Sequence, residues 1–192
     1  MVGALAVFLG TALTAIVVNS FVLRYGLHFD WSISKYVGLE LWSVMMFAMG
    51  NVAVAILMAK YLWRLGQAWR MPKIYYWAIV VLVTTLMGLS VFPVGFMKDP
   101  SGRTTIVSWA HNMMSRTMFI TMMGVAGMIV LNRRANKGAR IANAIYLIYA
   151  AICIAGYMME TEWFMGCVMI FESVYLAWFM GLMMGCKCGV MS

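Results

Sequence analysis

Residues 106–140 read IVSWAHNMMSRTMFITMMGVAGMIVLNRRANKGAR, an apolar run followed directly by a short loop rich in arginine and lysine. About 20 consecutive apolar residues are enough for an α-helix to cross the hydrocarbon core of a membrane. Short loops rich in Lys and Arg stay on the cytoplasmic side. The stretch therefore predicts a membrane-spanning helix whose carboxyl end reaches the cytoplasm.

The same pattern recurs along the whole chain, which is 65% hydrophobic and 10% charged, with a mean hydropathy of +0.89. Soluble domains average about 25% charged residues, so this composition cannot supply a water-facing surface. Helices are expected rather than strands because each run is continuously apolar and backbone groups in lipid must be paired within the segment. We predict an all-α membrane protein, one domain over residues 1–192, whose six spans are residues 2–23, 37–62, 74–96, 106–131, 141–160 and 163–185.

The distribution of charge predicts the orientation of this bundle. The basic residues of the second and fourth connections and of the tail are Lys60, Arg64, Arg70, Lys73, Arg133, Arg134, Lys137, Arg140 and Lys187. The carboxylates occur in the alternate connections or in the spans beside them, at Asp30, Glu40, Asp99, Glu160, Glu162 and Glu172. Because the basic loops belong inside, both termini are expected in the cytoplasm.

A net charge of +8 would suggest nucleic acid as the partner of a soluble protein. Here the cations lie mainly in two short loops between apolar spans, so we expect no nucleic acid partner. Basic residues next to a membrane attract anionic lipid, at about 1 kcal/mol per residue. Membrane lipids, with anionic lipid at the cytoplasmic face, are therefore the expected partners; a protein partner is left open.

Two opposite charges inside the spans form the most informative pair. Arg116 lies in the fourth span and Glu172 in the sixth, each about nine or ten residues from the outer end, so their depths match at about 1.5 Å per residue. A lone charge at that depth costs about 2.5–3.5 kcal/mol. The pair is interpreted either as a structural ion pair between two helices or as a site for a ligand or a proton.

Polar residues around Arg116 predict a cavity that opens toward the outer leaflet. Trp109 and Asn112 share a helix face with Arg116, and His111 and Ser115 occupy an adjoining face. His111 is expected either to titrate with external pH or simply to form a hydrogen bond at the interface. Glu40 and Asp99 are candidates for the same outer vestibule. On the inner half of this span, Gly124 and Gly127 predict close approach of a neighbouring helix.

The sequence gives little support for a metal, haem or catalytic site. His28 and His111 are the only histidines, so neither a zinc ligand set nor a bis-histidine haem is expected, and no cofactor is predicted. Serine-nucleophile motifs, catalytic carboxylate pairs and phosphate-binding glycine loops are absent from the sequence. Cys186 and Cys188, at the predicted inner boundary, are either sites of palmitoylation or buried thiols.

A few short motifs resemble those of a known group. They are Phe92-Pro93 at the outer end of the third span, His111 at the start of the fourth, Phe171-Glu172 in the sixth and Ser32-Ile33-Ser34 before the second. With the six-span plan, they resemble the six-helix bacterial membrane proteins of unknown function grouped with the Frag/DRAM-like superfamily. The resemblance implies a multi-pass protein of a bacterial plasma membrane and suggests lipid handling; it implies no catalytic residues.

Two functions from different classes follow from these residues. The leading hypothesis is a non-enzymatic polytopic protein that binds lipid or organises a membrane complex through the outer polar cavity. The alternative is a small proton- or ion-coupled transporter in which Glu172 and His111 exchange protons. Transporters usually contain broken helices, and Pro93 marks the one candidate break in the sequence. A lipid enzyme with His111 as base is less favoured, because no nucleophile accompanies it.

Overall fold

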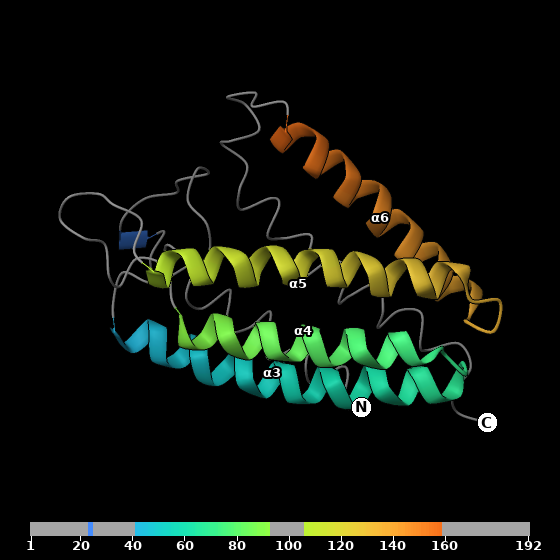
Figure 1. Cartoon of the computed structure of the whole chain (residues 1–192), viewed down its shortest axis with the longest axis horizontal. Helices are drawn as coiled ribbons and strands as arrows, with labels where there is room; N and C mark the ends of the chain where they lie inside the picture. Colours follow the sequence, from blue (N-terminus) through green and yellow to red (C-terminus); the bar gives the residue numbers. More distant parts are fainter. Residues whose placement is uncertain (1–22, 25–40, 93–105, 159–192) are drawn as a thin grey trace.

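The computed structural model describes residues 23–24, 41–92 and 106–158, and every element in these residues is an α-helix (Figure 1). The main helices are α3 (Leu41–Ala68), α4 (Lys73–Val91), α5 (Ile106–Leu131) and α6 (Lys137–Met158). Three of them, α3 from Trp42 onward, α4 and α5, are long and apolar enough to cross a membrane. The all-helical class is thus confirmed for the described residues, and three of the helices are compatible with a membrane protein. The first and sixth predicted spans and both termini lie outside the described residues, so the six-span plan stays a prediction.

Two helices end at other residues than the predicted spans. The predicted second span stops before Arg64, and the predicted third span runs past Pro93. Helix α5 coincides with the predicted span 106–131, but α3 continues beyond 62 to Ala68 and carries Lys60 and Arg64 on its exposed surface. Long basic side chains extend toward water from a helix that continues past the hydrocarbon. Helix α4 ends at Val91, where Phe92 leaves the helical region with φ −114° and ψ 74°. Pro93 follows, and a residue before proline disfavours the helical conformation.

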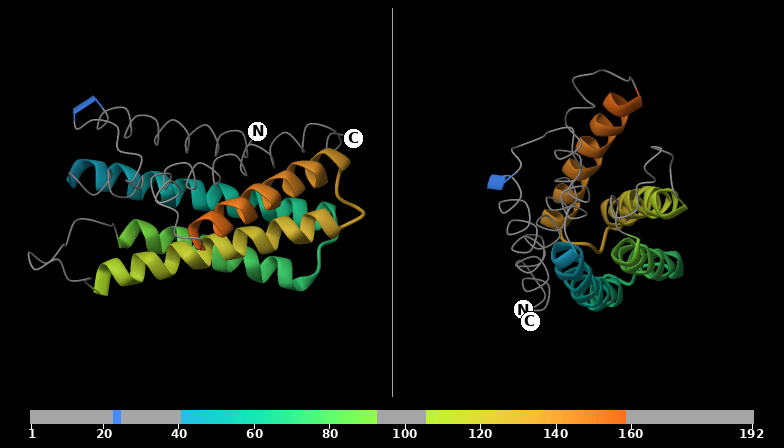
Figure 2. Two further views of the ribbon diagram at one scale, coloured as in Figure 1. Left: turned by 90° about the horizontal axis from the view of Figure 1, so that it is seen from above. Right: turned by 90° about the vertical axis from the view of Figure 1, so that its left-hand side faces the viewer.

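Consecutive helices are neighbours in space: α3 packs on α4, α4 on α5, and α5 on α6. Helices α3, α4 and α5 run side by side in alternating directions, while α6 diverges from α5 at an angle (Figures 1 and 2). The α3–α4 and α5–α6 turns consequently lie at the same end of the bundle. Residues 23–24 lie near the opposite end. This geometry brings together the two basic connections, as the charge pattern predicted.

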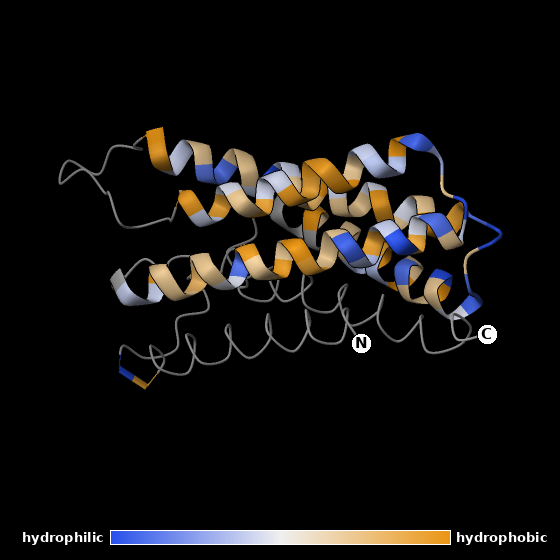
Figure 3. Ribbon diagram, turned by 90° about the horizontal axis from the view of Figure 1, so that it is seen from below, coloured by the Kyte–Doolittle hydropathy of each residue, from blue (hydrophilic) through white to orange (hydrophobic). Residues whose placement is uncertain are grey.

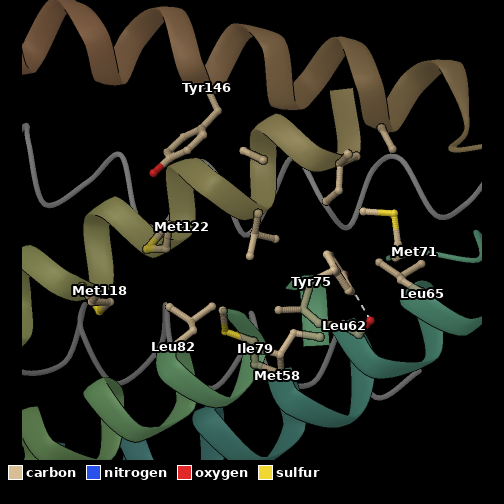
Figure 4. Packing of buried hydrophobic residues seen from close by; sticks show 14 of the residues in the cluster. Met58, Leu62, Leu65, Met71, Tyr75, Ile79, Leu82, Met118, Met122 and Tyr146 are labelled. Atoms are coloured by element: carbon tan, nitrogen blue, oxygen red, sulfur yellow. Dashed lines mark hydrogen bonds between the residues drawn. The ribbon is translucent and has the colours of Figure 1, made fainter. Parts of the chain in front are cut away.

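The core lies between these helices and consists of apolar side chains that are almost fully enclosed (Figure 4). Its largest completely buried members are Tyr75, Met58, Leu62, Ile79, Leu82, Met122 and Ile129. The hydroxyl of Tyr75 donates a hydrogen bond to the carbonyl of Leu62 at 3.1 Å. A buried hydroxyl needs such a partner, because leaving it unpaired costs about 1–3 kcal/mol. Tyr75 therefore ties α4 to α3 through both packing and a polar contact.

Close helix contact depends on glycines other than those predicted. A Cβ added at Gly66 would lie 2.7 Å from Cε1 of Tyr75, and one added at Gly88 would collide with the Met114 sulfur. At Gly124 and Gly127 an added Cβ meets no atom within 4 Å. The inner half of α5 does pack, but through Met122 and its buried neighbours. Among the described residues no helix approaches Gly124 or Gly127 closely, so close approach there stays a prediction.

Gly66→Ala should destabilise the protein relative to Gly124→Ala. Both changes gain about 1 kcal/mol of helix propensity, but only Gly66→Ala forces a methyl group against the enclosed ring of Tyr75, at about 1–3 kcal/mol. Thermal unfolding of the two variants in detergent measures the difference. Equal unfolding temperatures would contradict the α3–α4 contact described here.

The two basic turns should be reached by labelling reagents from the same side of the membrane. In a variant without the four native cysteines, Lys73→Cys and Arg134→Cys should both be protected from a membrane-impermeant maleimide in intact cells. Arg24→Cys, near the other end, should react. Opposite accessibility of residues 73 and 134 would overturn the shared end, and reaction of both from outside would reverse the predicted orientation.

Candidate functional site

The polar residues predicted on the outer half of α5 point in two directions. Trp109, Asn112 and Arg116 lie on the exposed side of the helix. His111 is buried against α4, and Ser115 is half-buried between the two faces. The structure thus separates His111 from the stripe that contains Arg116.

Arg116 lies within an exposed stripe that is otherwise largely apolar. Met113 precedes it and Ile120 follows it on the same face, with 43% and 70% of their surfaces exposed. At about 1.5 Å per residue, Arg116 lies about 15 Å along α5 from Ile106. A guanidinium on such a surface must either bind an anion or extend toward the interface. The described residues contain no aspartate or glutamate, so an anionic partner has to come from elsewhere.

The carboxylates predicted to pair with Arg116 or to line the outer vestibule lie outside the described residues. They are Glu172, Glu40 and Asp99, and the same holds for Cys186 and Cys188. The Arg116–Glu172 ion pair therefore stays a prediction, together with the membership of Glu40 and Asp99 in an outer vestibule. Within residues 23–24, 41–92 and 106–158, no group of three or more His, Cys, Asp or Glu side chains could hold a metal ion.

His111 fastens the start of α5 to the end of α4. Its Nδ1 lies 2.6 Å from the carbonyl oxygen of Phe92. Because a carbonyl can only accept, Nδ1 must carry the proton in this contact. The Phe92 amide in turn donates to the Gly88 carbonyl at 3.0 Å. His111 thus donates a hydrogen bond from α5 to the end of α4. The roles expected for it at the membrane interface and in proton exchange stay predictions.

Cations gather at the opposite end of the bundle, around the two turns (Figure 3). At the turns the exposed members are Arg70, Lys73, Arg133, Arg134 and Lys137, and Arg140 is half-buried. The exposed Lys60 and Arg64 lie further back on α3. The Arg140 Nε donates to the Val130 carbonyl at 2.9 Å, so this side chain caps the end of α5. No carboxylate accompanies these cations among the described residues. This end is a concentrated positive surface.

Asn132 joins the two turns to one another. Its side-chain Nδ2 donates to the carbonyl of Trp69 at 3.0 Å and also contacts the Met71 sulfur at 2.7 Å. Its Oδ1 accepts from the backbone amide of Arg134 at 2.9 Å. One amide group thus uses both its donor and its acceptor to fix the α5–α6 turn onto the α3–α4 turn. The backbones that carry the cations of the two turns are consequently held in one arrangement.

The turn after α3 has the hydrogen bonds of a Schellman motif. The Met71 amide donates to the Gly66 carbonyl at 2.8 Å, and the Arg70 amide to the Gln67 carbonyl at 3.2 Å. The residue between the helix end and Met71 must adopt a left-handed conformation, a position usually occupied by glycine. Here it is Arg70, with φ 48°. Arginine at this position is unfavourable for the backbone, because its Cβ crowds the neighbouring peptide groups.

Sequence reasoning missed Asn132 and the conformation of Arg70. Asn132 stands between an apolar run and two arginines, where an asparagine is ordinarily read as a solvated loop residue. A glycine at position 70 would have predicted the left-handed conformation, but an arginine does not. The sequence Trp69-Arg70-Met71-Pro72 does hold a weaker clue, since proline is common shortly after a helix end.

Comparison of the chain with protein-family models, with curated proteins and with solved structures finds no match. The resemblance to the Frag/DRAM-like group therefore stays a prediction.

Asn132→Ala should lower the stability of the protein by about 1–3 kcal/mol. The change removes the half-buried hydrogen bond to the Trp69 carbonyl and the exposed one from the Arg134 amide, and each hydrogen bond contributes about 0.5–1.5 kcal/mol. Asn112→Ala, on the exposed face of α5, is the matched control and should have an effect within about 0.5 kcal/mol. Chemical unfolding in detergent would measure both. Equal losses for the two variants would show that the turns are not coupled through Asn132.

Proposed function

We propose that the chain is a non-enzymatic integral membrane protein that binds lipid through the outer half of α5. Three helices that can cross a membrane support the location. The observation that carries the proposal is the exposed guanidinium of Arg116 within the apolar stripe of Met113 and Ile120. A positive group on such a surface binds an anion, and the phosphodiester of a phospholipid is the anion that every bilayer supplies.

The chemistry of the stripe suits a phospholipid headgroup. Guanidinium presents planar paired donors that match two phosphate oxygens. Asn112 lies about one turn nearer the outer end and adds an amide to the same face. Trp109, 61% exposed, lies nearer still to that end, where indole rings favour the membrane interface. The flexible arginine stem can extend outward toward the phosphate level while its methylene groups stay in the hydrocarbon.

Glu172 is the competing partner for the same guanidinium. An intramolecular pair would lock the helices that carry the two residues, and removing one member of a buried pair typically costs 3–5 kcal/mol. A lipid-binding arginine would contribute little to folding. The two uses of Arg116 therefore differ in stability and in lipid content, both of which can be measured. The transporter alternative additionally requires His111 to release its contact with Phe92 during proton exchange.

Arg116→Gln should retain the fold and reduce bound phospholipid at least about tenfold, since a charge-assisted hydrogen bond contributes about 1.5–3 kcal/mol. Native mass spectrometry of detergent-purified protein measures the lipid retained, and thermal unfolding measures the fold. Arg116→Lys should lose less lipid, because it keeps the charge but not the paired donors.

Glu172→Gln provides the matched control. For a lipid site it should leave lipid retention equal to or above that of the unmodified protein. If Arg116→Gln and Glu172→Gln lower the unfolding temperature alike and leave lipid content unchanged, the guanidinium serves an internal ion pair and the lipid proposal is wrong. Phospholipid retained unchanged by a stable Arg116→Gln protein would also exclude it.

A further inference from the structure

The turn between α3 and α4 alternates buried and exposed side chains around Arg70. Trp69 and Met71 are 5% and 6% exposed and anchor the turn in the core. Arg70 between them is exposed and has its backbone in the left-handed region, at φ 48°. The turn therefore holds one cation at its tip while both neighbours are immobilised. Glycine would form the same hydrogen bonds without crowding, so the arginine is not there for the sake of the fold.

The α3–α4 turn, with Arg70 at its tip, is connected to the α5–α6 turn, which carries Arg133 and Arg134. Asn132 donates to the carbonyl of Trp69, and its Oδ1 accepts from the Arg134 amide. Arg133 and Arg134 are both exposed. The backbone of the Arg70 turn and the backbone of the arginine pair are thus connected through a single side-chain amide. The backbone positions that carry these cations are therefore fixed near one another before any ligand arrives, which reduces the backbone entropy lost on binding.

Clustered cations repel each other unless an anion lies between or against them. Carboxylates are absent from the described residues, so none of these neutralises the cluster. The apolar residues that border the two turns indicate which anion does. Ile74 and Leu131, next to Lys73 and Asn132, are 67% and 81% exposed. A protein surface at the boundary between hydrocarbon and headgroups has apolar residues directly beside cations. An anion that binds from water would leave Ile74 and Leu131 exposed to water, so a lipid fits this surface better.

We propose that the Arg70 turn, together with Arg133 and Arg134, is a binding site for the headgroup of an anionic phospholipid in the inner leaflet. The strained backbone of Arg70 is retained because it presents the guanidinium at the tip, in register with the arginine pair. This site is at the opposite end of the bundle from Arg116 and does not depend on the lipid site proposed there.

Arg70→Gly separates the stability of the turn from its binding. Glycine relieves the left-handed strain, so the unfolding temperature of the full-length protein in detergent should rise, by roughly 2–4 °C. The same variant should lose preference for anionic lipid. Native mass spectrometry with phosphatidylglycerol and phosphatidylcholine titrated in parallel should give a phosphatidylglycerol preference lower by about fivefold, the factor expected for one basic residue at the surface.

Three further proteins complete the test. Arg70→Lys keeps both the charge and the left-handed strain, so it should retain most of the preference without gaining stability. Lys60→Gln removes one positive charge from α3 outside the turns and should change the preference less than Arg70→Gly. The loss of preference caused by Arg70→Gly should be the same in the unmodified protein and in an Arg116→Gln background, which separates failure at this site from failure of the outer one. Excess inorganic phosphate should not displace phosphatidylglycerol, because the apolar border favours a lipid over a free ion.

Four results would overturn the proposal. If the Arg70→Gly protein is more stable and its lipid preference is unchanged, Arg70 ends the helix in a strained conformation but does not bind lipid. A destabilised Arg70→Gly protein would show that the arginine side chain supports the fold. If Lys60→Gln lowers the phosphatidylglycerol preference as much as Arg70→Gly does, the preference depends on net charge and not on the Arg70 turn. Displacement of the lipid by inorganic phosphate would indicate a site for free phosphate.

Discussion

The structure depends on one constraint: in hydrocarbon, polar backbone groups must be paired within the helix, and charged groups are expelled toward the ends. Helices α3, α4 and α5 satisfy it with apolar residues on their outer surfaces as well as in the core between them. The cations of the described residues gather mainly around the two turns at one end of the bundle. The resulting exterior is suited to lipid along its length and to anionic headgroups at that end.

Within this frame, the helices are fastened by polar contacts to backbone carbonyls. His111 holds the carbonyl of Phe92 near one end, and Asn132 holds that of Trp69 at the other. Between them, Tyr75 binds the Leu62 carbonyl inside the core. Such bonds fix the relative rotation and depth of helices in a way that apolar packing alone specifies weakly, because the outer surfaces of these helices are apolar as well as the core between them. These three bonds and the core join α3, α4 and α5 into one packed unit.

Two arginines break local rules, and both proposals rest on them. Arg116 puts a charge on an apolar helix face, and Arg70 occupies a backbone conformation that favours glycine. Natural sequences are generally consistent with their folds, and exceptions concentrate where a residue serves binding. A guanidinium is the side chain best able to grip a phosphodiester. The two proposals therefore assign the same lipid chemistry, in opposite leaflets, to two otherwise unrelated irregularities.

The sequence alone determined the helical class, the extent of α5 and the gathering of basic turns at one end, because hydropathy and loop charge are properties of the chain read in one dimension. Tertiary structure decided which residues meet. It placed Gly66 rather than Gly124 against a neighbouring helix, turned His111 inward and away from Arg116, and gave Asn132 a role that its loop position did not suggest. These outcomes depend on how each helix is rotated and which helix lies beside it. A pattern of apolar residues exposed on every side leaves that rotation unspecified, since lipid and core attract the same side chains.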